Sequence, residues 1–272
     1  MNIPLSPAGI PLFGFGTYPL TGDEVYRAVR MAIDIGIRHI DTAQMYGNEK
    51  DVGRAIRDCG IARAELYVVT KVDPGNTGKD RFAPSTAQSI ADLGGPADLL
   101  LIHWPPDDSD FDAALDRLMA EKARGSAKAI GVSNFNPAML RRAHQRTNGD
   151  IINNQVEFHP LLDQSKLLAA ANELGVTLSA YSPLARGAAL KPQAIQDIAA
   201  RLGRAPSEVV LRWIIQQGVV AIPMTTKRDN ALSNLKALDF TLIAEDLNAI
   251  TAIGTRQGRI INPSWMAGRW GD

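Results

Sequence analysis

Hydrophobic and polar positions follow a repeating unit along the chain. In each unit, a stretch with apolar residues three or four apart is followed by a glycine and then by a short run of Val, Ile and Leu. Val25, Val29 and Ile33 have this spacing, which is typical of a helix that covers one face of a sheet. A glycine ends a helix readily because it adopts the left-handed conformation without steric cost. The glycines expected in this role are Gly36, Gly60, Gly94, Gly125, Gly149, Gly175 and Gly218.

The apolar runs after these glycines have the length of β-strands, and an eighth run precedes the first helix. The expected strands are 11–15, 37–40, 66–70, 98–102, 128–132, 151–154, 176–180 and 219–222. The last interval between glycines holds two helical stretches divided near Arg204-Ala205-Pro206, and a helix from about Glu245 to Ile253 closes the series. Strands that alternate with helices without a linker predict an α/β fold, a closed (β/α)8 TIM barrel.

We therefore expect one barrel domain over residues 1–272, with a C-terminal tail from about 255 to 272 near the active-site mouth. The alternative is an open, doubly wound sheet, which would begin with a glycine-rich phosphate loop after its first strand. Residues 14–19 (GFGTYP) lack the third glycine of that motif and carry a proline where a helix would begin. This segment is interpreted as a strand end followed by a turn.

Composition narrows the possible partners. The 272 residues include 29 basic and 29 acidic side chains, so the formal net charge is zero and gives no general attraction to nucleic acid or anionic membranes. The single cysteine, Cys59, excludes an intrachain disulfide and a zinc site of several thiolates. No targeting segment is evident in residues 1–17, and the apolar run 99–102 is far too short to span a bilayer. We expect a cytoplasmic protein, monomeric and without a metal.

Ionisable side chains stand at or just after the ends of three expected strands: Asp41, Tyr46, Lys71 and His103. In a barrel of this kind these ends meet at one mouth. An ammonium group beside a phenol favours phenolate, and a carboxylate can orient the lysine, so the trio makes a tunable proton donor. Taken singly, each residue has a simpler interpretation. Asp41 and Lys71 could form a structural ion pair between neighbouring strands. His103 could be a hydrogen-bonded histidine at the rim, and Tyr46 could be a packing residue.

Nine segments in order along the chain resemble the aldo-keto reductase family. They are 14–17 (GFGT), 36–43 (GIRHIDTA), 46–49 (YGNE), 70–71 (TK), 101–105 (LIHWP), 131–135 (GVSNF), 154–160 (NQVEFHP), 181–184 (YSPL) and 222–223 (IP). The resemblance implies reduction of an aldehyde or ketone to an alcohol by hydride transfer from NAD(P)H. It assigns Tyr46 as the general acid, Lys71 and Asp41 as groups that lower the phenol's pKa, and His103 as the group that orients the carbonyl.

The same resemblance implies where the cofactor binds. Ser133, Asn134 and Gln155 correspond to contacts of the nicotinamide carboxamide, and Tyr181 to the ring on which nicotinamide stacks. Ser133 and Asn134 have an alternative interpretation as caps of the helix that begins near Asn136, and Tyr181 as a core residue. The other candidate cofactor contacts are Gly16, Thr17, Tyr18, Asp41, Ser182, Leu184, Ala185, Ile222, Pro223, Thr225, Lys227, Arg228, Asn230 and Asn234.

The segment after the eighth strand departs from the family. Met224 and Asn230 stand where many members carry the cations that grip the adenosine 2′-phosphate. Lys227 and Arg228 lie close in sequence and could substitute, or could be a solvated basic pair at a helix start. We therefore expect a preference for NADPH, with NADH possible, and the helix start offers backbone N–H groups to a phosphate.

The expected substrate is a small carbonyl compound. Tyr18, Met45, Trp104 and Trp265 are candidates for the pocket wall, although tail aromatics could instead plug the barrel rim. The connection 104–110 is short, which favours small or flexible substrates.

Two other functions stay open. The first is a Schiff-base aldolase that uses Lys71, because a lysine at the end of a barrel strand also suits that chemistry. The second is a non-catalytic barrel that senses nicotinamide nucleotides. The aldolase interpretation explains neither Tyr46 nor the candidate phosphate-binding segment after the eighth strand. The presence of Asp41, Tyr46, Lys71 and His103 together, which we call the tetrad, weighs against a sensor.

Overall fold

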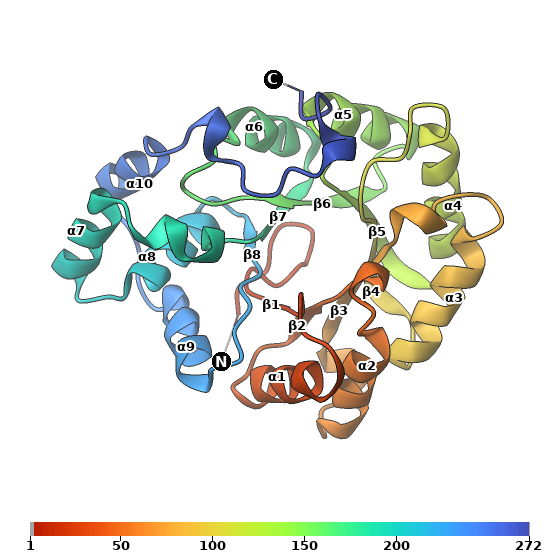
Figure 1. The fold of residues 1–272 in the computed structure, drawn as a ribbon, viewed down its shortest axis with the longest axis horizontal. Coiled ribbons are helices and arrows are strands. Elements are labelled where there is room, and N and C mark those ends of the chain that lie inside the picture. The colour runs from red at the N-terminus through yellow and green to blue at the C-terminus, as the bar shows by residue number, and fades with distance from the viewer. Residues whose placement is uncertain (1–2, 272) are drawn as a thin grey trace.

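Eight parallel strands form one sheet in the order of the chain (Figure 1). The computed structural model describes residues 3–271. The strands are β1 (Phe15–Gly16), β2 (His39–Asp41), β3 (Tyr67–Val72), β4 (Ala97–Ile102), β5 (Ala127–Ser133), β6 (Ile151–Glu157), β7 (Thr177–Tyr181) and β8 (Val220–Ala221). Every predicted strand is present at shifted boundaries, and the predicted single-domain α/β barrel is confirmed.

The barrel closes through residues just before β1. The Ala221 N–H donates to the Leu12 carbonyl at 2.9 Å, and the Gly14 N–H donates to the Ala221 carbonyl at 2.9 Å. Residues 11–15 were expected to form the first strand, but β1 covers only Phe15–Gly16. The physical reason is that residues 12–14 hydrogen-bond to β8, and the chain pairs with β2 only from Phe15 onward.

Helices surround the barrel on its outside (Figure 1). They are α1 (Gly22–Asp34), α2 (Glu49–Asp58), α3 (Phe82–Leu93), α4 (Phe111–Ala123), α5 (Pro137–Arg146), α6 (Ser165–Leu174), α7 (Gln193–Leu202), α8 (Pro206–Gln216), α9 (Arg228–Leu235) and α10 (Ala244–Thr251). All seven glycines predicted to end helices have a positive φ, as Gly94 does at 82°. The predicted division near Pro206 separates α7 from α8, and the predicted closing helix is α10.

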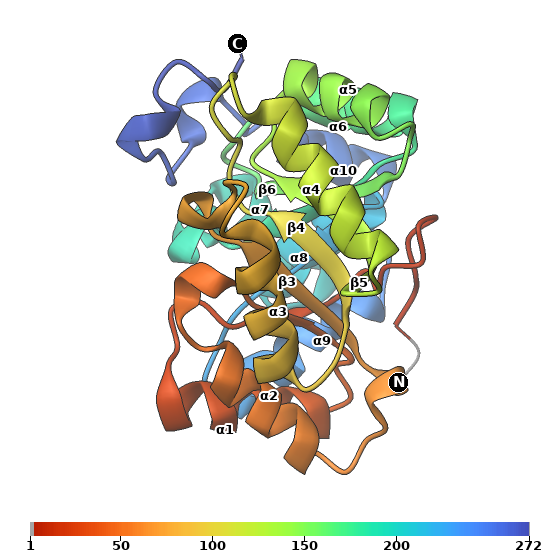
Figure 2. The ribbon, with the colours of Figure 1, turned by 90° about the vertical axis from the view of Figure 1, so that its right-hand side faces the viewer.

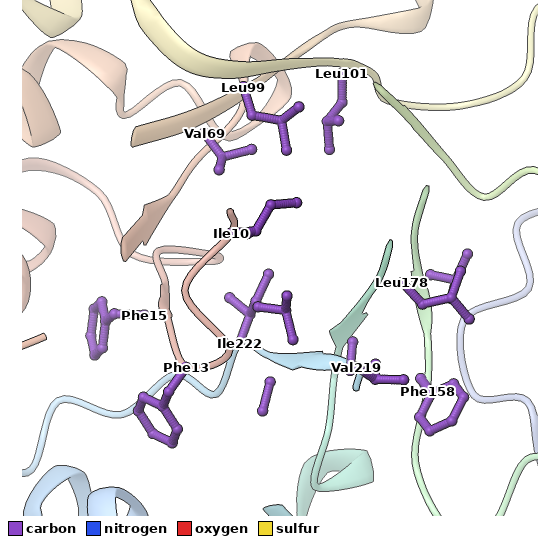
Figure 3. Close-up of a cluster of buried hydrophobic side chains, with 14 of the residues drawn as sticks. Ile10, Phe13, Phe15, Val69, Leu99, Leu101, Phe158, Leu178, Val219 and Ile222 are labelled. Atoms are coloured by element: carbon purple, nitrogen blue, oxygen red, sulfur yellow. The ribbon is translucent and has the colours of Figure 1, made fainter. Parts of the chain in front are cut away.

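The core is a continuous set of buried aliphatic and aromatic side chains. Within the barrel, Ile10 of the N-terminal hairpin lies near Val69 and Leu99 (Figure 3). Ile10 and Val69 are almost fully buried, at 0% and 1% exposure. The hairpin is held by an antiparallel bridge between Leu5 and Pro11. Burial of apolar surface of this kind is the main favourable contribution to folding.

Helices α2 and α3 approach each other closely at Gly53. A Cβ atom at this position would lie 1.9 Å from the Asp92 carbonyl oxygen. Only a residue without a side chain allows this separation, so Gly53 fixes how the two helices pack.

The C-terminal residues 255–271 cross one end of the barrel. They pass beside α5 and α6 and lie away from α1 and α2 (Figures 1 and 2). Trp265 and Trp270 have ring centroids 6.1 and 6.2 Å from that of Trp104, which follows β4. No helix within residues 3–271 is long and apolar enough to cross a membrane.

Candidate active site

Consecutive parallel strands bring four ionisable side chains to one mouth of the barrel. Asp41 ends β2, Lys71 is the penultimate residue of β3, and His103 directly follows β4. Tyr46 ends a short 3₁₀ turn, η1 (Gln44–Tyr46), that begins three residues after Asp41. Because the strands are parallel, their carboxyl ends meet at the same edge.

Lys71 is the centre of this cluster. Its Nζ lies 2.7 Å from Asp41 Oδ1, 2.8 Å from the Thr42 carbonyl oxygen and 3.3 Å from the Tyr46 hydroxyl. The Lys71 side chain is 0% exposed and that of Asp41 is 5% exposed. An ammonium group has three donors, and each has an acceptor here. The site therefore holds a buried, fully hydrogen-bonded cation against a phenol.

The protonation states follow from burial and charge. Burial alone would lower the pKa of Lys71, but the Asp41 carboxylate and the Tyr46 hydroxyl outweigh it and raise that pKa. Burial raises the pKa of Tyr46, and Lys71 opposes this shift only in part. Lys71 lowers the pKa of Tyr46 as expected, but Asp41 raises it, contrary to the expectation, and burial makes the net shift upward. Tyr46 keeps its proton at neutral pH.

His103 faces the tyrosine as a neutral ring. The two ring centroids lie 5.6 Å apart in an edge-on arrangement. Burial, and secondarily Lys71, lowers the pKa of His103 well below its usual value. Its Nδ1 is buried and has no hydrogen-bond partner among the described residues. A neutral imidazole at this place can donate one hydrogen bond from a ring nitrogen without adding charge.

A partly buried polar network fixes the turn that carries Tyr46, and the sequence did not single it out. Gln44 Oε1 accepts hydrogen bonds from the Asp73 N–H and from Asn76 Nδ2, both at 2.9 Å. Gln44 Nε2 donates to Ser89 Oγ at 3.1 Å, and Ser89 donates to Glu49 at 3.0 Å. The signal available in the sequence was the YGNE segment, where Glu49 follows Tyr46 at i+3.

The residues expected around nicotinamide form one hydrogen-bonded group with the tetrad. Gln155 Nε2 donates to Asp41 Oδ2 at 2.7 Å, and Ser133 Oγ donates to the Gln155 carbonyl at 2.7 Å. Asn134 Nδ2 donates to the His103 carbonyl at 3.0 Å, and the Tyr181 hydroxyl donates to Asn134 Oδ1 at 2.8 Å. The four side chains expected around nicotinamide thus lie at the same end of the barrel as the tetrad.

Ser133 and Asn134 do not cap the following helix. The N-cap of α5 is Asn136, whose Oδ1 accepts the Met139 N–H at 2.9 Å. Asn134 instead has φ of 65°, a left-handed conformation that costs energy in a residue with a side chain. The alternative interpretation of these two residues as helix caps is therefore wrong.

The loop after β7 is unusual in its backbone. Ser182, Ala185 and Arg186 have φ of 48°, 46° and 53°, and such conformations cluster at functional sites. Leu184 between them is half-buried.

The residues at the end of β1 lie on another side of the mouth. The Gly16 N–H donates to the Pro223 carbonyl at 3.1 Å. The hydroxyl of Thr17 is buried and has no hydrogen-bond partner among the described residues.

The segment after β8 changes from buried to exposed. Ile222 and Pro223 are buried, Thr225 is half-buried, and Lys227, Arg228 and Asn230 are exposed. Helix α9 begins at Arg228, and Thr225 Oγ1 accepts the Lys227 N–H at 3.1 Å. Within residues 3–271, neither basic side chain forms an ion pair. Asn234, in the same helix, is 5% exposed and Met224 is 38% exposed.

Aromatic side chains extend outward from the tetrad. The Tyr18 ring lies 5.1 Å from that of Tyr46, and the Trp104 ring 6.2 Å from that of His103. Tyr18, Met45 and Trp265 are 59%, 44% and 58% exposed, which is high for large apolar side chains. Exposed apolar side chains that form a contiguous patch mark binding surfaces.

The structure is an α/β barrel that gathers ionisable side chains at the carboxyl ends of its strands. Residues 11–255 match the Aldo/keto reductase family, and the chain belongs to that family of oxidoreductases. It is 39% identical over 265 residues to methylglyoxal reductase DkgB of Escherichia coli O157:H7, covering 96% of this chain and 99% of that protein. The family resemblance noted in the sequence is confirmed.

Solved structures agree with this assignment. The Bombyx mori aldo-keto reductase AKR2E4 in complex with NADP is 30% identical, with a TM-score of 0.91 and 99% of each chain covered. Gox0644, solved in complex with NADPH as a variant, is 30% identical with a TM-score of 0.89, and 96% of each chain is covered.

Proposed function

We propose that this protein reduces the carbonyl group of a small aldehyde or ketone with NADPH, and that Tyr46 is the general acid. The observation that carries the proposal is the Lys71 ammonium, whose three donors reach Asp41, the Thr42 carbonyl and the Tyr46 hydroxyl. This contact favours the phenolate that forms when Tyr46 gives up its proton. Until then, burial keeps the phenol protonated.

Each polar residue has a defined task. The bound cofactor supplies the hydride that reduces the carbonyl carbon. Tyr46 donates its proton to the carbonyl oxygen, and Lys71 stabilises the resulting phenolate. His103, held neutral by burial, donates a hydrogen bond that orients the carbonyl oxygen beside Tyr46. Positioned acid catalysis of this kind contributes roughly 10²–10⁴-fold to a rate.

The residues present fit a nicotinamide cofactor. Asn134, Ser133 and Gln155 offer amide and hydroxyl groups at the depth of Asp41, and Tyr181 offers a half-buried ring beside them. The unpartnered hydroxyl of Thr17 needs an acceptor or donor that the described chain does not supply. These groups would hold the amide and ribose ends of the cofactor.

A preference for NADPH is supported by charge. Lys227 and Arg228 are exposed at the start of α9, and neither is engaged by a carboxylate among residues 3–271. A 2′-phosphate would gain charge-assisted hydrogen bonds from them, and the helix start adds free backbone N–H groups. Met224 and Asn230 replace two cations of the family, so the preference should be smaller than a complete clamp gives.

We propose a small, reactive carbonyl compound as substrate, with methylglyoxal as the first compound to test. The name of the E. coli relative supports this choice. The wall of the pocket would be Tyr18, Met45, Trp104 and Trp265, with the tail forming its outer side. Trp104 is 7% exposed, and its ring lies between those of His103 and Trp265, so we expect it to restrict the site to a short substrate.

The Schiff-base aldolase is disfavoured by the state of Lys71. That chemistry needs a neutral amine with an open approach, whereas Lys71 is fully buried, uses all three donors and has a raised pKa.

The test compares wild type with Tyr46→Phe in a methylglyoxal reduction assay that follows loss of reduced-nicotinamide absorbance. We expect turnover of the variant to fall by about 100-fold or more, with NADPH affinity within a few-fold of wild type, because only the transferable proton is removed. A variant that keeps more than about a tenth of wild-type turnover would show that Tyr46 is not the acid.

A further inference from the structure

We propose that Glu157 is a positioning residue for the substrate pocket, and that it acts by fastening the C-terminal tail over the barrel mouth. The inference rests on the proposed function, because the tail carries Trp265 of the proposed pocket wall. Glu157 itself is 0% exposed and ends β6, two residues after Gln155. It takes no part in the hydrogen bonds of the tetrad.

The Glu157 carboxylate binds the main chain of the tail. Its Oε1 accepts the Ile260 N–H at 2.7 Å, and its Oε2 accepts the Ile261 N–H at 2.9 Å. His159 Nε2 lies 2.8 Å from Oε1, and His159 is also almost fully buried, at 1% exposure. The contact requires the tautomer in which Nε2 carries the proton. The carboxylate is thus surrounded by three N–H groups, two of which belong to the tail.

Burial makes this contact strong. A buried carboxylate is costly unless its oxygens are hydrogen-bonded. If the tail moved away, the Glu157 carboxylate would lose the Ile260 and Ile261 donors and keep the His159 contact. Detachment of the tail would therefore cost free energy, because the buried carboxylate would lose two of these three donors.

Neighbouring main-chain contacts set the same segment against the loop after β6. The Thr255 N–H donates to the Leu161 carbonyl at 3.0 Å, and the Asp163 N–H donates to the Thr255 carbonyl at 3.1 Å. Gly258 lies so close that a Cβ atom there would be 1.7 Å from the Leu161 carbonyl oxygen. Residues 255–261 form what we call the inner anchor of the tail.

The tail is fastened again at its far end. Arg269 donates to the carbonyl oxygens of Pro105 and Pro106 at 3.3 and 2.5 Å. Asn136 Nδ2 donates to the Arg269 carbonyl at 2.8 Å. Between this outer anchor and the inner anchor, Trp265 reaches the Trp104 ring. The position of Trp265 is therefore set by both anchors, and Glu157 is the buried charge in the inner one.

The experiment compares Glu157→Gln with Glu173→Gln as a matched control. Both changes remove one negative charge, but Glu173 is 61% exposed and pairs with Arg141 of α5, and none of the hydrogen bonds that hold the two anchors of the tail involves it. The first readout is limited trypsin digestion, because the bond after Arg259 joins it to Ile260, whose N–H is held by Glu157. We expect cleavage there to be roughly tenfold faster in Glu157→Gln, as expected for loss of a charge-assisted hydrogen bond.

The second readout is steady-state kinetics with methylglyoxal and NADPH. We expect KM for methylglyoxal to rise about tenfold, with kcat within about threefold and NADPH affinity unchanged, because a displaced wall weakens substrate binding without altering the proton donor. A general loss of folding would not separate KM from kcat in this way. Gly258→Ala displaces the same anchor from the other side and should reproduce both effects.

The outcomes separate the inference from the function on which it rests. If wild type reduces no carbonyl compound with either cofactor, the proposed function fails. If wild type is active and Glu157→Gln matches Glu173→Gln in cleavage rate and in KM, the positioning role is refuted. A fall in kcat at constant KM would also overturn it. Should Glu157→Gln not fold, the Gly258→Ala variant decides by the same two measurements.

Discussion

Replacing Asp41 with Asn should destabilise the protein mainly through Lys71. The substitution keeps an oxygen that can accept a hydrogen bond, but it removes the only carboxylate that pairs with Lys71 within residues 3–271. Both side chains are nearly fully buried, at 0% and 5% exposure, so solvent screens the remaining charge little. Breaking a buried pair by removing one partner costs about 3–5 kcal/mol. Because the asparagine oxygen can still accept a hydrogen bond from Lys71, we expect the unfolding free energy to fall by about 3 kcal/mol, the lower end of this range.

A double-mutant cycle isolates the charge as the cause. Lys71→Met removes the ammonium at similar volume and leaves Asp41 with its Gln155 contact. The double variant Asp41→Asn/Lys71→Met buries neither charge, so its unfolding free energy should exceed the additive expectation by about 2 kcal/mol. Urea denaturation at neutral pH measures the unfolding free energies of wild type, the two single variants and the double variant. If the losses of unfolding free energy in the two single variants add up to the loss in the double variant within about 0.5 kcal/mol, the argument is refuted, because the two charges then do not interact.

The stabilisation by the Lys71–Asp41 pair should depend on pH. The pKa of Lys71 is raised in the folded protein, so its stabilising contribution is complete below the unfolded value, about 10.4, and is lost as pH rises through the folded value. In Asp41→Asn the carboxylate is gone and burial opposes the charged amine. The stability difference between wild type and Asp41→Asn should therefore be largest at neutral pH and shrink above about pH 10.

Three further outcomes are expected. The double variant Lys227→Ala/Arg228→Ala should weaken NADPH binding about tenfold or more and leave NADH binding nearly unchanged in fluorescence titrations; equal losses for both cofactors would mean that the pair does not contact the 2′-phosphate. Carbonyl reduction should show no inflection near the usual histidine pKa, because burial keeps His103 neutral, and should decline only at alkaline pH as Tyr46, whose pKa is raised, loses its proton; a pH–rate profile with a step near 6.5 would argue that His103 titrates. Gly53→Ala should lower the unfolding free energy by about 1–3 kcal/mol in urea denaturation, because the new methyl group would lie 1.9 Å from a carbonyl oxygen of α3, and an unchanged midpoint would show that the helices shift freely.

The sequence alone determined the architecture and the cluster of ionisable residues. Strand length, helical spacing and C-terminal glycines are local properties, so the repeat gave eight strands in the observed order. Parallel order then implied that Asp41, Lys71 and His103 meet at one mouth. The first strand was misplaced because its pairing depends on β8, some 200 residues away, and barrel closure has no local signal.

Only the tertiary structure decided the electrostatics and the role of the tail. The direction in which the pKa of Tyr46 shifts depends on the balance between burial and the Lys71 charge. The spacing of residues in the sequence does not tell how deeply Tyr46 is buried. Likewise, Glu157 and His159 appeared in the sequence only as part of a family motif without a task. The contacts of Glu157 with Ile260 and Ile261 join residues 103 and 104 positions apart, a distance over which a chain can bring two segments together only by folding.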